Sequence, residues 1–216
     1  MIYEFPSESD PIRQGDIFLG LPRMDISLNE IVVYEEGGER ETSWAEIAQD
    51  EESVNILVPV RSVAAVVATQ DCDAVRSRDI TLCEIREFRD VEPSTKDTKS
   101  AKAWISRIIQ QARINQKWFY LPPDEQIGFK EKMAVDFLVT LRIPREDLES
   151  LRSLRKGRLN PVADEHFRER IAEFFRRYPY DEWYPLNQEE LATYAAAHEG
   201  TKPYPWQNFT GSVEKS

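Results

Sequence analysis

The chain has 216 residues, and 41% of them are hydrophobic, which is enough to bury the core of one domain. Its formal net charge of −11 disfavours a protein that grips DNA through the phosphates. The sequence has no apolar run of about 20 residues and no apolar leader, so we expect a cytoplasmic protein that does not bind membranes.

Short apolar and β-branched runs dominate the first part of the chain. Residues 1–12 are polar and interrupted by prolines, and we expect an N-terminal arm there. After a turn at 13–16, the charged stretch 39–52 is expected to be a surface excursion. The run at 62–69, SVAAVVAT, is the most apolar and predicts a central strand that pairs with 80–88. Further strands are expected at 17–19, 31–34 and 54–60.

The pattern changes to helical spacing later in the chain. Apolar residues three and four positions apart predict one helix near 98–116, and strands are expected at 118–121 and 133–141. Asn160 followed by Pro161 is typical of a helix start. We therefore predict an α+β fold, with a small antiparallel β-barrel at 13–143, an inserted helix, a helical C-terminal region at 144–199 and a tail at 200–216.

The densest polar cluster is Gln70-Asp71-Cys72-Asp73, which follows the central strand directly, where folded proteins commonly carry sites. It forms either a binding site, in which Cys72 or Thr69 acts and the carboxylates orient a partner, or a turn whose carboxylates bind backbone. Negative charge on both sides disfavours a reactive thiolate at Cys72. We predict a structural loop with Cys72 buried and with Asp71 or Asp73 accepting hydrogen bonds from backbone or arginine.

Basic residues gather late in the chain, most densely in the segment RSLRKGR at 152–158, which has no acidic member. A phosphate backbone would be bound best here, so RNA is a candidate partner. The basic members are Arg152, Arg155, Lys156 and Arg158. The sequence has no glycine-rich phosphate loop and no histidine or cysteine pair at metal-binding spacing, so we predict no cofactor and no metal site.

Two segments resemble one protein family. The segment RQGDIF, at 13–18, resembles the opening of the PemK/MazF family of toxin ribonucleases, and residues 61–69 resemble the central strand of that family. The resemblance implies an SH3-like antiparallel β-barrel. In that family an arginine before the central strand and a serine or threonine after it serve RNA cleavage, and the matching residues here are Arg61 and Thr69. The QDCD sequence also resembles a group of uncharacterised bacterial proteins with a similar opening.

The sequence departs from the toxin family in three ways. Ser62 stands where the family has a proline, a long stretch separates residues 26 and 59, and the C-terminal third is additional. These departures and the negative charge favour a non-catalytic, toxin-like barrel that docks a partner protein in a bacterial stress or defence system. The alternative is a metal-independent endoribonuclease acting on single-stranded RNA. That activity requires the side chains of Arg61 and Thr69 to share one open cleft.

Overall fold

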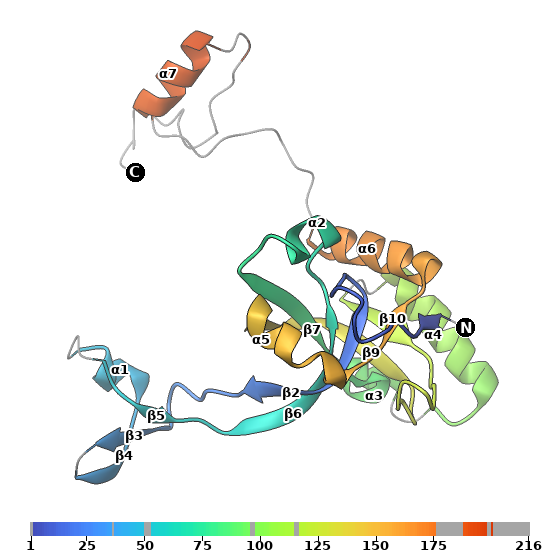
Figure 1. The fold of residues 1–216 in the computed structure, drawn as a ribbon, viewed down its shortest axis with the longest axis horizontal. Helices are drawn as coiled ribbons and strands as arrows, with labels where there is room; N and C mark the ends of the chain where they lie inside the picture. Colours follow the sequence, from blue (N-terminus) through green and yellow to red (C-terminus); the bar gives the residue numbers. More distant parts are fainter. Residues whose placement is uncertain are drawn as a thin grey trace, which may run out of the picture. The chain divides into compact units, whose positions relative to one another are not determined.

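The computed structural model describes residues 2–35, 37–49, 53–95, 98–114, 117–175, 188–197 and 200. The chain divides into two compact units, Met1–Phe175 and Arg176–Ser216. The first unit holds both sheets, as Figure 1 shows. In the second unit, the described secondary structure is helix α7 (Gln188–Ala197).

A seven-stranded antiparallel sheet forms the centre of the first unit, with the strand order β1-β10-β2-β6-β7-β9-β8. The predicted central strand is present as β6 and pairs with β7, and Val66 and Val67 are fully buried, as predicted. The strands are β1 (Tyr3–Glu4), β2 (Asp16–Met24), β6 (Val60–Val67), β7 (Asp79–Glu87), β8 (Trp118–Leu121), β9 (Met133–Pro144) and β10 (Arg155–Leu159). Among the described residues no ladder joins the edge strands β1 and β8, so the sheet is open, and a closed barrel is not shown.

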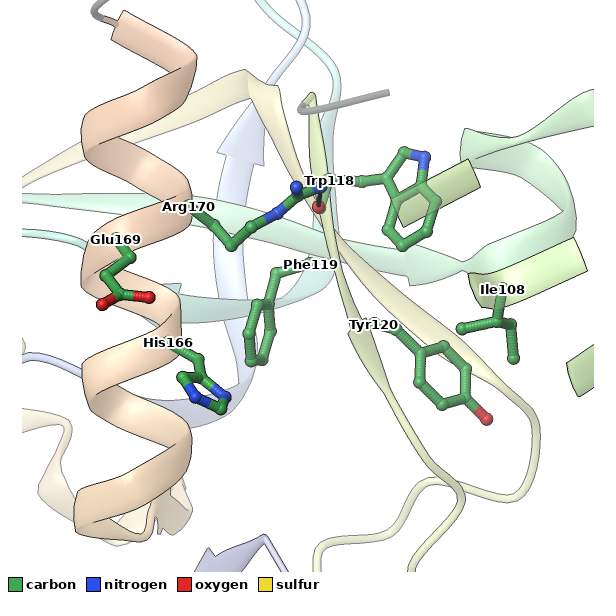
Figure 2. A pocket seen from close by; sticks show the side chains of 7 residues that line it. All are labelled: Ile108, Trp118, Phe119, Tyr120, His166, Glu169 and Arg170. Carbon is green, nitrogen blue, oxygen red and sulfur yellow. Dashed lines mark hydrogen bonds between the residues drawn. The ribbon is translucent and has the colours of Figure 1, made fainter. Parts of the chain in front are cut away.

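Successive side chains of β6 point to opposite faces of the sheet, and a hydrophobic core covers each face. Val66 packs in one core with Phe137 of β9 and Phe167 of helix α6 (Pro161–Phe175). Val67 packs in a second core with Leu148 of helix α5 (Arg145–Ser150). A third cluster joins helices α3 (Phe88–Val91) and α4 (Ala101–Ile114) to β8. Residues of α4 and α6 therefore lie on opposite sides of β8, as Figure 2 shows.

A second sheet stands between β2 and β6 in the sequence. It has three antiparallel strands in the order β4-β3-β5, with helix α1 (Trp44–Ile47) beside them. Its strands are β3 (Ile31–Glu35), β4 (Gly38–Thr42) and β5 (Ile56–Leu57). The expected surface excursion at 39–52 therefore contains a strand and a helix. Ser43 begins that helix, because its side chain accepts from the backbone of Glu46 and the Glu46 side chain accepts in return.

The two ends of the first unit differ most from expectation. The region from 144 onwards is not only helical, since it supplies β10, which lies between β1 and β2 in the main sheet. The expected N-terminal arm is docked through β1 and through Ile12, which is buried. Asn160 caps α6 as predicted, because its Oδ1 accepts from the backbone N–H of Ala163 at 2.9 Å. The expected tail at 200–216 lies outside the described residues, Gly200 excepted.

Three short elements complete the described structure: α2 (Asp71–Ala74) and the 3-10 turns η1 (Pro93–Thr95) and η2 (Arg152–Leu154). None of the described helices has the length and apolar character that a bilayer span requires.

Candidate functional site

The RQGD and QDCD motifs, 54 residues and more apart in the sequence, lie side by side in the structure. The backbone N–H of Gln14 donates to Oδ1 of Asp71 at 2.9 Å, and its side-chain Nε2 donates to the carbonyl of Ala68 at 2.8 Å. Gly15 has a φ of 81°, which favours glycine, and a Cβ at this position would lie 2.9 Å from Oδ1 of Asp164. The turn that begins β2 is thus anchored to the segment that follows β6.

The QDCD segment forms the helical turn α2 rather than an open loop. Asp71 accepts a backbone hydrogen bond, as predicted. The prediction that Cys72 is buried is wrong, because Cys72 is exposed and Cys83, in β7, is the buried cysteine. The inward position of the turn is taken by Ala74, which is 3% exposed. In a single helical turn only one side can face the core, and here the small side chain of Ala74 occupies it.

A carboxyl group beside this junction has an unsatisfied oxygen. Asp164, in the first turn of α6, is 7% exposed, and its Oδ2 accepts from Nε of Arg168 at 3.0 Å. Its Oδ1 is buried and meets no hydrogen-bond donor among the described residues. Burial raises the pKa of Asp164, and the nearby charge of Asp71 adds to that effect. Within the described ranges, no group of three or more histidine, cysteine, aspartate and glutamate side chains is placed to hold a metal ion.

Arg61 and Thr69 stand at opposite ends of β6 rather than together. Eight positions of extended chain separate them, about 26 Å at about 3.3 Å per residue. The Arg61 guanidinium donates to both oxygens of Glu84, at 3.0 and 3.1 Å, and Nε donates to Asp25 at 2.7 Å. These contacts with Glu84 and Asp25 raise the pKa of Arg61. Thr69 has a structural contact, since its Oγ1 accepts from the backbone N–H of Thr81 at 2.8 Å.

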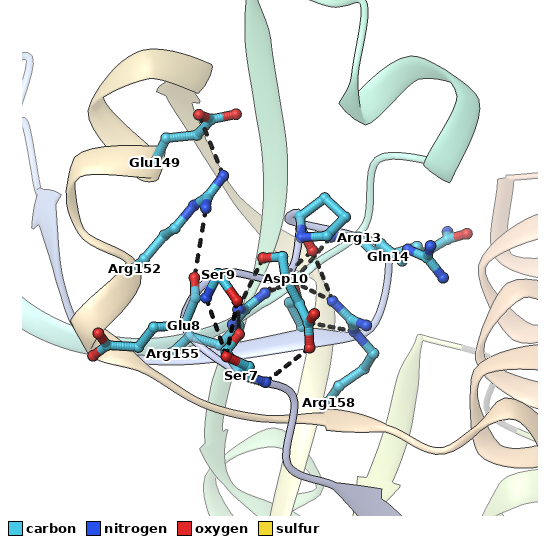
Figure 3. Close-up of polar contacts among 12 residues, drawn as sticks. Ser7, Glu8, Ser9, Asp10, Arg13, Gln14, Glu149, Arg152, Arg155 and Arg158 are labelled. Carbon is cyan, nitrogen blue, oxygen red and sulfur yellow. Dashed lines mark hydrogen bonds and ion pairs between the residues drawn. The ribbon is translucent and has the colours of Figure 1, made fainter.

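The basic segment at 152–158 is used mainly inside the protein. Asp16 is fully buried, and it accepts from Nη1 of Arg155 at 3.1 Å and from Nε of Arg158 at 2.5 Å. The same two arginines also bind carbonyls of the N-terminal segment: Arg155 binds Asp10 and Arg158 binds Pro11. Figure 3 shows these contacts, which join β10 to the first residues of the chain.

The other two basic residues of this segment are more accessible. Arg152 forms an ion pair of 3.5 Å with Glu149, and its Nη1 lies 3.5 Å from the carbonyl of Glu8. Lys156 is exposed, and its Nζ donates to the carbonyl of Ser153 at 3.3 Å. Of the four residues of the predicted phosphate contact, Arg155 and Arg158 are occupied by Asp16, Arg152 is half-buried and Lys156 is exposed.

Sequence reasoning missed a groove along β8. A pocket of about 260 Å³ lies between α4 and α6, with Ile108 on one wall, His166 on the other and the backbone of β8 between them (Figure 2). A neighbouring hollow of about 620 Å³ shares Phe119, Tyr120 and His166 with it. The aromatic run at 118–120 is expected to be core, which holds for Trp118, at 1% exposed, whereas Phe119 and Tyr120 are half-buried and line the pocket. The sequence pattern did not indicate that this run forms the edge of the sheet.

Sequence reasoning anticipated a charged surface stretch at 39–52, but it did not identify the exposed apolar side chains of residues 25–59. This segment contains ten of the aspartates and glutamates and a single basic residue, Arg40, so it carries most of the net charge of −11. It also exposes large apolar side chains along with the strand ends that lead to it. These are Met24, Ile26, Leu28, Tyr34, Trp44, Val54, Leu57 and Val60. A hollow of about 700 Å³ on the second sheet is lined by Glu30, Glu41 and Glu46 among others.

No protein-family model matches the chain, and a search of curated proteins gave no match.

Proposed function

We propose that this chain is a non-catalytic, toxin-like barrel protein that docks a partner protein in a bacterial stress or defence system. The observation that carries the proposal is the composition of residues 25–59, in which acidic and exposed apolar side chains occur together. Several large exposed apolar side chains gather in this segment and in the strand ends beside it, and a concentration of exposed apolar surface is typical of interaction sites. The RQGD turn and the antiparallel ladder β2-β6-β7 support the barrel relationship.

The partner chemistry follows from this surface. A partner with basic and apolar side chains would be steered by the negative charge and held by the apolar contacts. Lysine and arginine would face Glu39 and Glu41, which are exposed on β4, while apolar groups would cover Trp44 and Leu57.

The ribonuclease alternative is less well supported by the geometry. Arg61 and Thr69 are at opposite ends of one strand, so they do not act on the same phosphate. The Arg61 guanidinium is also held by Glu84, which is 2% exposed, and by Asp25. An arginine that stabilises a transition state must reach the reacting phosphate, and this one donates to two carboxylates that it shares with Arg23.

The test removes the second sheet and leaves the first intact. Met24 and Val60 are direct partners in the β2–β6 ladder, so residues 25–59 can be replaced by Asn-Gly, which closes a two-residue hairpin. Binding to the protein encoded beside this gene is measured by titration calorimetry at low and high salt. We expect the full chain to bind and the shortened chain not to bind, with the protection of the β6 and β7 amides unchanged.

A matched pair of charge reversals refines this experiment. Glu41→Lys lies on β4, and Glu125→Lys is an equally exposed reversal outside the segment. We expect Glu41→Lys to lower the affinity for the partner and to reduce its dependence on salt. Glu125→Lys should leave the affinity and its salt dependence unchanged. Equal binding by the full and shortened chains would contradict the proposal. Cleavage of single-stranded RNA in the presence of a chelator, abolished by Arg61→Ala, would establish the alternative instead.

A further inference from the structure

Strand β8 is an edge of the main sheet and has β9 as its partner on one side. The backbone N–H of Phe137 donates to the carbonyl of Lys117 at 2.9 Å, which fixes the phase of the ladder. In an antiparallel ladder, alternate residues exchange hydrogen bonds with the partner strand. Phe119 and Leu121 therefore bond to β9, and the backbone groups of Trp118 and Tyr120 point away from it.

A side-chain contact supports this orientation independently. Nη2 of Arg170, in α6, lies 3.3 Å from the carbonyl oxygen of Trp118 and donates to it. That oxygen must therefore face away from β9 and toward the groove. Burial lowers the pKa of Arg170, as expected for a guanidinium drawn into an apolar groove. The described part of the chain places no strand against the N–H groups of Trp118 and Tyr120 or against the carbonyl of Tyr120.

The walls of the groove are suited to the two faces of a strand. Figure 2 shows Ile108 and Tyr120 on one side of the β8 backbone and Phe119 and His166 on the other. Side chains of a strand alternate between two faces, so an added strand would bring its side chains against both walls. The α4 side of the groove is apolar, with Ile108 beside the ring of Tyr120, whereas the α6 side carries His166, Glu169 and Arg170 around Phe119. The occupant that fits is an extended segment with uncharged β-branched side chains, apolar on the face toward α4 and polar on the face toward α6.

We propose that this groove binds an extended segment of a partner protein, which adds to the main sheet beside β8. Backbone groups that recur at every second residue are matched by another strand and not by a helix, whose backbone groups are bonded internally. A second copy of the chain fits less well. Paired strands lie about 4.8 Å apart, and in each copy helices α4 and α6 flank β8 on both of its faces.

The experiment uses amide hydrogen exchange of the full chain and a defined probe, the capped hexapeptide of alternating valine and threonine. We expect the peptide to slow exchange at Trp118 and Tyr120 by about tenfold or more, because these amides gain a partner. Exchange at Phe119 and Leu121 should stay slow with and without the peptide. Methylation of the alternate peptide amides that face β8 should abolish the effect, and methylation of the other set should preserve it.

Two variants on one helix serve as a matched pair. Ile108 lines the groove, whereas Ile109 is 52% exposed and does not line it. We expect Ile108→Glu to weaken the peptide about tenfold or more, because a charge enters an apolar contact, and Ile109→Glu to have no such effect. Protection that is insensitive to the position of the methyl groups would overturn the proposal. Protection that increases with protein concentration in the absence of peptide would also overturn it, by showing that a second copy occupies the edge.

Discussion

The carboxylate of Asp16 accepts hydrogen bonds from Arg158, 142 residues later in the chain, and Asp16 is fully buried. Arg155 donates to the same carboxylate. Asp16→Ala leaves two guanidiniums without their buried partner, so we expect the free energy of unfolding to fall by about 3–5 kcal/mol. Urea denaturation followed by circular dichroism measures this change. Glu125→Ala, at an exposed site, is the control and should shift the free energy by no more than about 0.5 kcal/mol.

The two carboxylates of the QDCD segment should differ in their contribution to stability. Asp71 accepts from the backbone of Gln14, whereas Asp73 is exposed, and the described structure gives its carboxylate no hydrogen bond. We expect Asp71→Ala to lower the free energy of unfolding by about 1 kcal/mol, and Asp73→Ala to change it by less than about half of that. Equal effects in parallel urea titrations would show that the contact between the two motifs does not stabilise the fold.

The two cysteines should react very differently with alkylating reagents. Cys72 is exposed, whereas Cys83 is 2% exposed and burial raises its pKa to about 12. Since the thiolate is the reacting form, we expect iodoacetamide to modify the native protein once, at Cys72, at neutral pH. Peptide mass spectrometry identifies the site, and unfolding in urea should release the second. Modification of native Cys83 would contradict the observed packing of β7.

The stability of the chain should depend on the ionisation of Asp164. Burial raises the pKa of Asp164, so the folded chain keeps this proton at pH values at which the unfolded chain has lost it. The resulting stabilisation is present below the ordinary aspartate pKa of about 3.9 and is lost as the pH rises through the higher folded value. Asp164→Asn is uncharged throughout.

We therefore expect wild type to lose stability relative to Asp164→Asn as the pH rises above about 3.9, the ordinary aspartate value. Denaturation of both proteins at a series of pH values gives the difference. Carboxylates with lowered pKa values, such as Asp25 and Glu46, change stability in the opposite direction, and they cancel because both proteins contain them. A difference that is constant with pH would show that Asp164 titrates normally.

Local pattern was sufficient to predict the central strands and α4. The β6 run SVAAVVAT is apolar on both faces because cores lie on both sides of it, and such a run has few alternatives to a buried strand. The start of α6 was also predictable, because Asn160 and Pro161 act within a single turn. In each case the determining contacts are close in sequence or the apolar pattern is uniform.

The incorrect predictions concern segments whose burial depends on a residue far away in the sequence. The stretch at 155–159 reads as basic and exposed, and its burial depends on Asp16, which the local sequence does not reveal. Cys72 and Ala74 could each face inward from α2, and the local sequence does not determine that Ala74 is the one that does. Arg61 and Thr69 are far apart because β6 is extended. The family resemblance paired them by their role in RNA cleavage and gave no information on the distance between them.

The position of β10 between β1 and β2 affects how the chain folds during its synthesis. A ribosome releases residues 1–144 before the strand that separates β1 from β2 exists, so during synthesis Asp16 carries a charge with no guanidinium to meet it. At about 5–20 residues per second, this interval lasts on the order of seconds to tens of seconds after β2 has emerged. The nascent chain must therefore keep one side of β2 unpaired until Arg155–Leu159 leaves the exit tunnel, and a truncated message ending at Pro144 would yield a product that lacks the partner of its first strand.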